Sequence, residues 1–445
     1  MNAELLKLAE DTLSLALKAG ATSGEAMVLE RRDSSISMRE GVVEELEQAE
    51  AREVGLRVFA GQSSATIAGS VLTKEARQIL AERAVAMAKL APPDPFAGLA
   101  AAEQLAKSEL ELDLASNTFP TAAELKKLVE DTEKIALAVK GISKSGGAGA
   151  SSSESQVAVA MSNGFAKSYR RTGFGLSLGL IAGEGTHMVR DYYGTSAIHY
   201  ADLENAEKVA TTAAERTVKR INPQKLQSQS IPVIFDRRVA SSLLGHFAGA
   251  INGAGIARGV SFLKDKLGHQ VFNSGITIVD DPHRLRGFAS KSYDGEGLPT
   301  SRRNFIDKGM LTSWVLDLRS ARQLNLASTG SAARGLASNP SPSTTNLHME
   351  TGAQTQDELI MAMNKGLLIT EFIGSSINGA TGDYSRGASG FWIENGEVQF
   401  PVSEITVAGN LIEMFLHLTP ANDLEFRSST NAPSCLVEGM TIAGR

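Results

Sequence analysis

Apolar residues recur at helical spacing in five segments of the chain. In the first segment Leu5, Ala9, Leu13 and Ala16 fall on one face, and Gly20 follows where glycine commonly ends a helix. The same spacing predicts further helices over residues 73–90, 121–140, 205–220 and 239–251. The pattern therefore predicts helices at intervals along roughly the first half of the chain.

Short runs with strand character lie between and after these helices. An antiparallel meander is predicted over residues 25–29, 34–38, 44–48, 55–59 and 64–68. Further strands are predicted over residues 157–161, 166–171, 176–182 and 231–235. Glycine-containing turns predict hairpins around residues 162–164, 307–309 and 394–396. The Gly/Ser-rich stretch 141–153 is expected to be a loop or a hairpin tip.

Breaks in composition divide these elements into units. A helix-plus-meander domain covers residues 1–90, and a linker over 91–118 opens with two prolines, which end the preceding helix. A central α+β domain follows over 119–222, and a β-rich C-terminal domain covers 230–445. Runs of strands with segregated helices indicate an α+β protein with an N-terminal antiparallel sheet, rather than a doubly wound sheet.

Charge and composition narrow the class of protein. The chain has 44 Lys and Arg against 50 Asp and Glu, a net charge of −6, which argues against direct nucleic-acid binding. A single cysteine, Cys435, excludes an internal disulfide and fits a reducing compartment. The N-terminus lacks the pattern of a signal peptide, and the sequence holds no apolar run long enough to span a bilayer. We therefore expect a cytoplasmic protein without membrane contact.

The sequence contains no short motif that identifies a catalytic or cofactor-binding site. The glycines of 249–259 lack the spacing of a dinucleotide-binding loop, and neither H-E-x-x-H nor G-x-S-x-G occurs. None of the seven histidines has a second one at metal-binding spacing, so His246 alone is more often a packed or surface residue than a ligand. Cys435 lies in a strand-like stretch and is more often a small buried hydrophobe than a nucleophile.

The densest polar cluster covers residues 381–390, TGDYSRGASG. It combines donors, acceptors and an aromatic ring among three glycines, which let the backbone approach another chain closely. One interpretation is a structural turn, and the other is a recognition loop. We favour recognition, with Asp383, Tyr384, Ser385 and Arg386 as the binding side chains.

Longer stretches of the sequence resemble a known family. The stretches ATGDYSRGASG, GFWIENGE and PVSEITVAGN, together with YDGEGLPTSRR at residues 293–303, resemble the C-terminal domain of the PmbA/TldD family, also called modulators of DNA gyrase. The resemblance covers essentially the whole chain, is sharpest over residues 230–415, and is closest to the PmbA (TldE) branch.

The same resemblance implies that this chain lacks a metal. The TldD branch carries H-E-x-x-x-H on the helix after the first strand of its C-terminal domain, where two histidines bind the metal and the Glu can act as general base. At the matching positions this chain has Ser241, Ser242 and His246, so only one of three motif residues is present. We expect no catalytic residue and no cofactor here, with zinc in a partner subunit.

The family thus implies a function for the chain as one half of a pair. We expect a metal-free, substrate-binding subunit of a TldD/TldE-type heterodimeric peptidase that acts on extended, unfolded peptides, with His246 and residues 383–386 binding substrate or partner. The peptide could add as a strand to an exposed edge of the β-rich domain. Two alternatives are a stand-alone homodimeric peptidase with an unrecognised site and a regulatory protein that acts on a toxin–antitoxin or topoisomerase system.

Overall fold

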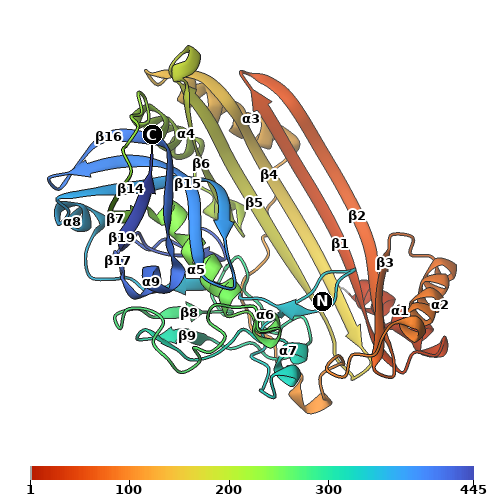
Figure 1. Cartoon of the computed structure of the whole chain (residues 1–445). Coiled ribbons are helices and arrows are strands. Elements are labelled where there is room, and N and C mark those ends of the chain that lie inside the picture. Colours follow the sequence, from red (N-terminus) through yellow and green to blue (C-terminus); the bar gives the residue numbers. More distant parts are fainter. Residues whose placement is uncertain (1–2, 445) are drawn as a thin grey trace.

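A long antiparallel sheet dominates one side of the molecule (Figure 1). The computed structural model describes residues 3–444, the side chain of Ser375 excepted. The sheet has six strands in the order β3-β2-β1-β4-β5-β6. They are β1 (Ser23–Arg39), β2 (Val42–Ala60), β3 (Ser63–Gly69), β4 (Ile142–Met161), β5 (Ala166–Ala182) and β6 (Val189–Ala197). Because β1 pairs directly with β4, residues of the predicted N-terminal and central domains share this one sheet.

Four helices cover one face of the long sheet. Near one end α1 (Ala3–Lys18) and α2 (Lys74–Leu90) bury apolar residues against the sheet, and near the other end α3 (Ala122–Leu137) and α4 (Ala206–Lys219) do the same. The strand residues in both cores are even-numbered on β1 and β4, from Ala26 to Met38 and from Ala148 to Ala160. Since side chains alternate across a strand, odd-numbered residues point to the opposite face.

Two predictions about these strands are wrong. The segments 25–29 and 34–38 are parts of the single strand β1, and 44–48 and 55–59 are parts of β2. The stretch 141–153, predicted as a loop, belongs almost entirely to β4. Its glycines and serines sit in a strand because the neighbouring strands β1 and β5 supply backbone partners along its length. Composition favoured a loop, and tertiary pairing overrode it.

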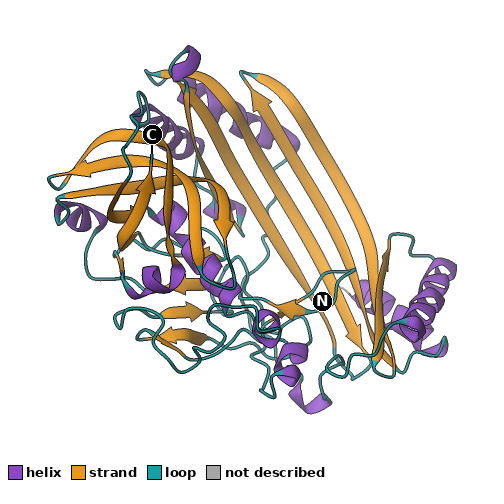
Figure 2. Ribbon diagram, viewed as in Figure 1, coloured by secondary structure: helices purple, strands orange, loops and turns teal. Residues whose placement is uncertain are grey.

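The C-terminal part folds around a curved sheet that closes on itself. Its order is β16-β15-β14-β7-β19-β17, and β16 also pairs with β19, so the strands form a barrel-like ring. The strands are β7 (Gln229–Phe235), β14 (Lys365–Ile377), β15 (Asp383–Glu394), β16 (Glu397–Asn410), β17 (Leu418–Pro420) and β19 (Cys435–Ala443). Helix α5 (Arg237–Ala250) lies beside these strands (Figure 1, Figure 2). It buries Leu243, Leu244 and Phe247 in the core that they share.

A smaller sheet and several short elements complete this part. The smaller sheet has the order β10-β9-β8-β13-β18, and a two-stranded sheet pairs β11 with β12. The strands are β8 (Ile278–Asp280), β9 (Arg303–Asp307), β10 (Met310–Leu311), β11 (Ala332–Ala333), β12 (Ser341–Pro342), β13 (Leu347–Met349) and β18 (Thr430–Asn431). The short helices are α6 (Gly253–Ala257), α7 (Leu318–Gln323), α8 (Gln356–Met361) and α9 (Leu411–Leu416).

The α+β class and the predicted hairpins are confirmed. The turn at 162–164 joins β4 to β5, Lys308 and Gly309 join β9 to β10, and Asn395 and Gly396 join β15 to β16. Each of these last four residues has a positive φ, as the turn requires. None of the helices within residues 3–444 is both long and apolar enough to cross a membrane.

A buried ion-pair cluster fastens the long sheet to the C-terminal part. Glu25 of β1 accepts a hydrogen bond from Arg57 of β2 at 3.3 Å and forms an ion pair at 2.9 Å with Arg334, which belongs to the C-terminal part. All three side chains are at least nine-tenths buried. Beside them Gly55 lies so close to Leu336 that an added Cβ would come within 2.1 Å of its carbonyl oxygen. The junction is therefore tightly packed at this end.

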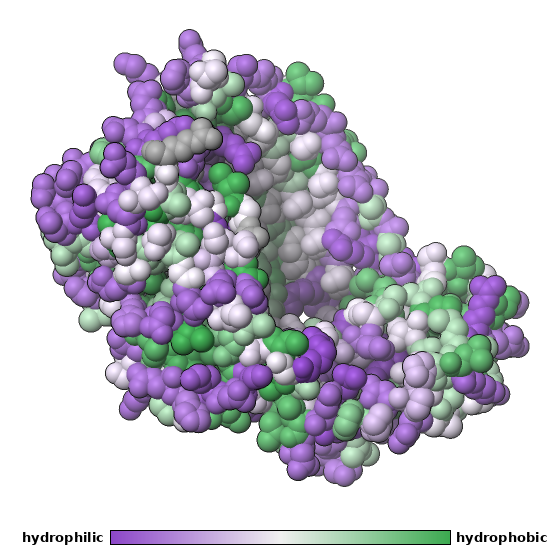
Figure 3. Space-filling view, in the orientation of Figure 1, coloured by the Kyte–Doolittle hydropathy of each residue, from purple (hydrophilic) through white to green (hydrophobic). Residues whose placement is uncertain are grey.

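The opposite face of the long sheet, which carries the odd-numbered residues of β1 and β4, is partly open. Near Met27 and Val159 it packs against Phe165 and Tyr293 in an apolar cluster. Farther along, serines and glycines line it, and a hollow separates it from the C-terminal part (Figure 3). We call the lined part of this face the serine groove: residues 35, 37, 149, 151, 153, 155, 173, 175, 177, 194 and 196.

Candidate functional site

Helix α5 carries the residues that the sequence singled out. Strand β7 ends at Phe235, and Asp236 caps the helix by accepting a hydrogen bond from the Arg238 backbone N–H at 3.0 Å, as predicted. Ser242 Oγ donates to the Val239 carbonyl at 2.7 Å, so this hydroxyl is engaged within the helix itself. His246 follows one helical turn after Ser242.

His246 packs against Tyr384 of β15 and lies within the electrostatic influence of Arg386. Its ring centroid lies 5.8 Å from that of Tyr384, edge to face, and the ring atom Nε2 is buried without a hydrogen-bond partner in the described part of the chain. Burial, and then the positive charge of Arg386, lower the pKa of His246 below its ordinary value of 6.5. The imidazole is therefore neutral near pH 7.

Tyr384 belongs to the core rather than to a loop. The segment 381–390 was expected to be a recognition loop, but from Asp383 onward it is strand β15, paired with β14 and β16. Tyr384 is only 2% exposed, and its ring lies 6.5 Å from Phe235. Gly390 fits between the strands because an added Cβ would meet the Leu368 carbonyl at 1.9 Å. Glycine here serves close strand pairing.

Arg386 and Asp383 have separate partners. Arg386 Nε donates to the Gly374 carbonyl at 3.0 Å, and its guanidinium carbon lies 4.2 Å from the centroid of the Phe372 ring. Asp383 is exposed and accepts from Thr381 Oγ1 at 2.6 Å and from Asn410 Nδ2 at 3.1 Å, which lowers its pKa. Within residues 3–444 no ion pair joins the two.

The five predicted binding residues are thus brought partly together. His246, Tyr384 and Arg386 form one cluster on α5 and β15, which we call the His246 cluster. Ser385 is half-buried and Asp383 is exposed. Their alternation along β15 places 384 and 386 on one face of the strand and 383 and 385 on the other. The cluster can accept and donate hydrogen bonds, and the binding role remains a prediction.

The side chains around α5 do not fit a zinc site. Hydroxyls stand where a histidine and a carboxylate would be needed, and a serine hydroxyl is a poor zinc ligand. Cys435 of β19 is fully buried and pairs with Phe235 of β7. Its Sγ donates to the Pro433 carbonyl, and burial raises the pKa of the thiol. In the part of the chain that the structure describes, no group of three or more His, Cys, Asp or Glu is placed to hold a metal ion.

Comparison with known protein families identifies the family of this chain. Models of three domains of the PmbA/TldA metallopeptidases match it in order: domain 1 over residues 24–88, the central domain over 117–221 and the C-terminal domain over 228–444. The chain belongs to the PmbA/TldD family. These matches cover most of its length.

Individual members of the PmbA/TldD family support this. The chain is 37% identical to the metalloprotease PmbA of Escherichia coli O157:H7 over 444 residues, covering 99% of this chain and 97% of that protein. A crystal structure of a modulator of DNA gyrase from Bacteroides thetaiotaomicron superposes with a TM-score of 0.93 at 27% identity, covering 100% of both chains. TldE from Thermococcus kodakarensis has the same fold, with a TM-score of 0.87 at 20% identity over 98% of this chain and 99% of its own.

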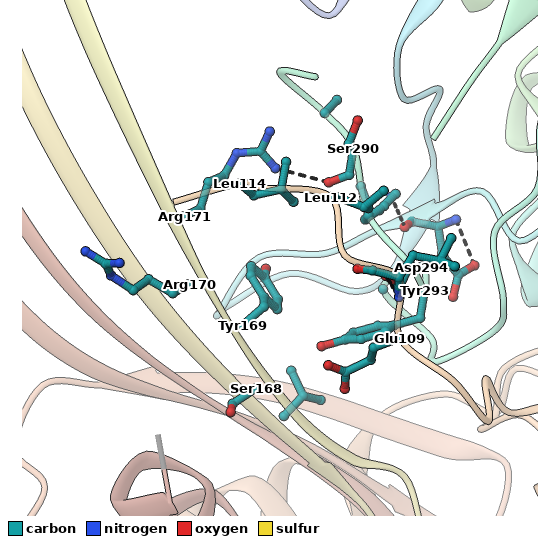
Figure 4. Close-up of a pocket in the computed structure, with 18 of the residues that line it drawn as sticks. Glu109, Leu112, Leu114, Ser168, Tyr169, Arg170, Arg171, Ser290, Tyr293 and Asp294 are labelled. Atoms are coloured by element: carbon teal, nitrogen blue, oxygen red, sulfur yellow. Dashed lines mark hydrogen bonds between the residues drawn. The ribbon is translucent and has the colours of Figure 1, made fainter. Parts of the chain in front are cut away.

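A separate cavity lies where the long sheet meets the C-terminal part. This junction cavity has a volume of about 580 Å³, and its walls come from β5, from residues 109–115 of the predicted linker, and from residues 289–295 and 332–334 (Figure 4). We placed no binding residue here from the sequence. The one signal available was that Tyr293 opens the stretch YDGEGLPTSRR, which carried part of the family resemblance.

Proposed function

We propose that this chain is the metal-free, substrate-binding subunit of a two-protein PmbA/TldD-type peptidase in the cytoplasm, and that a TldD-type partner supplies the zinc and the catalytic residues. The observation that carries the proposal is the surface of α5. Ser241 and Ser242 stand at the positions of a metal ligand and a general base, and Ser242 is already hydrogen-bonded to its own helix.

Serines at these two positions remove the chemistry of a metallopeptidase site. A serine hydroxyl cannot replace a carboxylate as general base near neutral pH, because its pKa lies far above that range. His246 remains as a neutral imidazole, and one imidazole alone holds zinc weakly. Cys435, the single cysteine of the sequence, is enclosed in the core. The chain therefore fits a role in holding substrate and partner better than a role in cleavage.

The serine groove is the surface that best suits an extended peptide. Pairing of β16 with β19 closes the barrel, which removes much of the strand edge that we expected to receive the substrate. By contrast, the groove crosses β1, β4, β5 and β6, and two adjoining hollows in it have volumes of about 390 and 340 Å³. Small hydroxyl side chains can bond to a peptide backbone without selecting its side chains, which suits a processing enzyme.

Mixing experiments test the proposal. The purified chain and a TldD-type chain with an intact H-E-x-x-x-H are assayed separately and together on an unfolded peptide. We expect chelator-sensitive cleavage only in the mixture. Robust chelator-sensitive cleavage by this chain alone would instead establish the stand-alone peptidase.

A variant addresses the His246 cluster within the same assay. Arg386 is half-buried, donates to a backbone carbonyl and lies over an aromatic ring, and it forms no ion pair within residues 3–444, so Arg386→Ala should leave the melting temperature nearly unchanged. We expect the mixture with this variant to lose activity or assembly. A large fall in melting temperature with unimpaired specific activity would assign Arg386 a structural role only.

A further inference from the structure

The junction cavity has an aromatic wall that faces empty space. Tyr169 of β5 is surrounded by protein, and burial raises the pKa of its hydroxyl, yet 42% of its surface remains accessible. That surface therefore borders the cavity. Tyr293 stands across from it, with the two ring centroids 6.3 Å apart, and its buried hydroxyl has no hydrogen-bond partner among the described residues (Figure 4). Unpaired buried hydroxyls are costly, and a ligand could satisfy this one.

One end of the cavity is cationic. Arg171 donates to the carbonyls of Gly287 at 2.7 Å and Ser290 at 3.3 Å, and Lys291 Nζ donates to the Ala332 carbonyl at 3.0 Å. Within residues 3–444 neither cation is in an ion pair with a carboxylate. Burial lowers the pKa of both groups, and at Lys291 the nearby carboxylates of Asp294 and Asp280 partly oppose this effect.

The other end carries an acid that already has a partner. Glu109, from the linker, pairs with Lys167 at 3.1 Å and lies well away from Arg171, with Tyr169 between them in the close-up (Figure 4). The cavity is thus polarised, with two cations at one end that form no ion pair among the described residues, and a neutralised pair at the other. An anionic group has one favoured place in it, beside Arg171 and Lys291.

The serine groove leads to the cationic end. Arg171 lines both the junction cavity and the neighbouring hollow, which also contains Ser153, Gly173 and Phe288. A chain lying along the open face of the sheet would therefore reach the cavity at Arg171. The volume of about 580 Å³ falls within the range of pockets that hold small organic ligands.

We propose that the junction cavity binds the C-terminal residue of a peptide, with its carboxylate on Arg171 and Lys291 and an apolar or aromatic side chain against the wall that Tyr169 and Tyr293 form. This assignment deepens the proposed function, on which the peptide nature of the ligand rests. It makes the groove directional, because the peptide then lies with its C-terminus toward the junction. Capture of a terminal carboxylate also discriminates peptide ends from the interior of folded chains.

Titration of the isolated chain with two probes tests the assignment. The probes are N-acetyl-phenylalanine and its amide, N-acetyl-phenylalaninamide, which differ only in the carboxylate, and binding is followed by calorimetry. We expect the acid to bind about tenfold or more tightly than the amide, the difference that one charge-assisted hydrogen bond supplies. Equal affinities for the two probes, or no binding of the acid, would overturn the proposal.

Variants locate the site. Lys291→Met should weaken binding of the acid about tenfold and leave the amide unaffected, whereas Lys126→Met, which removes the same charge from the exposed surface of α3, should change neither. Tyr169→Ala should weaken both probes without loss of melting temperature, because that ring borders open space. Unchanged affinity of folded Lys291→Met and Tyr169→Ala would place the probe elsewhere and refute the assignment.

These measurements are independent of the mixing assay. Binding is read on the isolated chain and needs neither the partner nor zinc. Failure of the mixture to cleave peptides would overturn the proposed subunit role and leave the probe result standing, and failure of the probes to bind would do the reverse.

Discussion

At the scale of single residues, His246 shows how a motif position can persist without its chemistry. In the TldD pattern this position is a metal-binding histidine. Here the ring packs against Tyr384, lies near the charge of Arg386, and has a ring nitrogen without a partner in the described part of the chain. Burial and like charge both favour its neutral form.

This environment predicts a pH effect on stability. The folded pKa of His246 is depressed below the unfolded value of 6.5, so below that pH the unfolded chain binds a proton that the folded chain resists. The free energy of unfolding should therefore decrease as the pH falls from 7.5 to 5.5, and His246→Gln should make this decrease smaller.

Urea unfolding at pH 7.5 and 5.5 measures this change in the free energy of unfolding for the wild type and for His246→Gln. The matched control is His269→Gln, which replaces an exposed histidine. A variant with the full wild-type pH dependence would show that His246 titrates normally in the folded chain.

At the scale of elements, α5 and the strands around it decide whether a metal could be held. The helix begins at a well-made cap and buries one apolar face in the barrel core. Its other positions could accept histidine or glutamate without disturbing that core, since Ser241 and Ser242 are only half-buried. A metal site would still need a further ligand, and Cys435 in strand β19 is enclosed in the core.

Restoring the motif on α5 should consequently fail to restore an enzyme. The double variant Ser241→His with Ser242→Glu recreates H-E-x-x-x-H, yet a working site also needs a further ligand and groups that orient the ligands. We expect the double variant to fold and to show no efficient, zinc-dependent cleavage by itself. Assays of peptide cleavage with added zinc, and metal analysis of the same sample, measure this; robust cleavage would show that the rest of the site is intact.

At the scale of the whole molecule, buried charges hold the two large parts together. Glu25 lies between Arg57 and Arg334, and a second cluster joins Asp191 of β6 to Arg220 and to Arg238 of α5 at 2.6 Å each. Buried ion pairs contribute little net stability when intact, but loss of one member leaves a charge without compensation. Such clusters fix the orientation of the sheet against the C-terminal part, and with it the shape of the groove and cavity.

Removal of the central acid should therefore be costly. Glu25→Ala leaves Arg57 and Arg334 buried together, and we expect it to lower the free energy of unfolding by about 3–5 kcal/mol. Glu50→Ala, which removes an exposed acid that pairs with Arg32, should cost at most about 1 kcal/mol. Denaturant titrations of both variants make the comparison; similar small losses would mean that solvent reaches the Glu25 cluster.

The sequence by itself determined the local structure and the family. Helix faces, the Asp236 cap and the three glycine turns follow from neighbouring residues, whose preferences act over a few positions and survive in the fold. The sequence also showed directly that Ser241 and Ser242 stand where the TldD pattern has a histidine and a glutamate, because this depends on residue identity alone.

Only the tertiary structure decided which surfaces meet. The pairing of β1 with β4 joins segments more than a hundred residues apart, and it turned a Gly/Ser stretch into strand and a meander into long strands. Pairing with β14 and β16 turned Tyr384 inward, although its polar neighbours suggested a loop. The junction cavity needs residues from β5, the linker and the C-terminal part at once. Contacts of this kind depend on how distant segments pack, and local preferences carry no information about them.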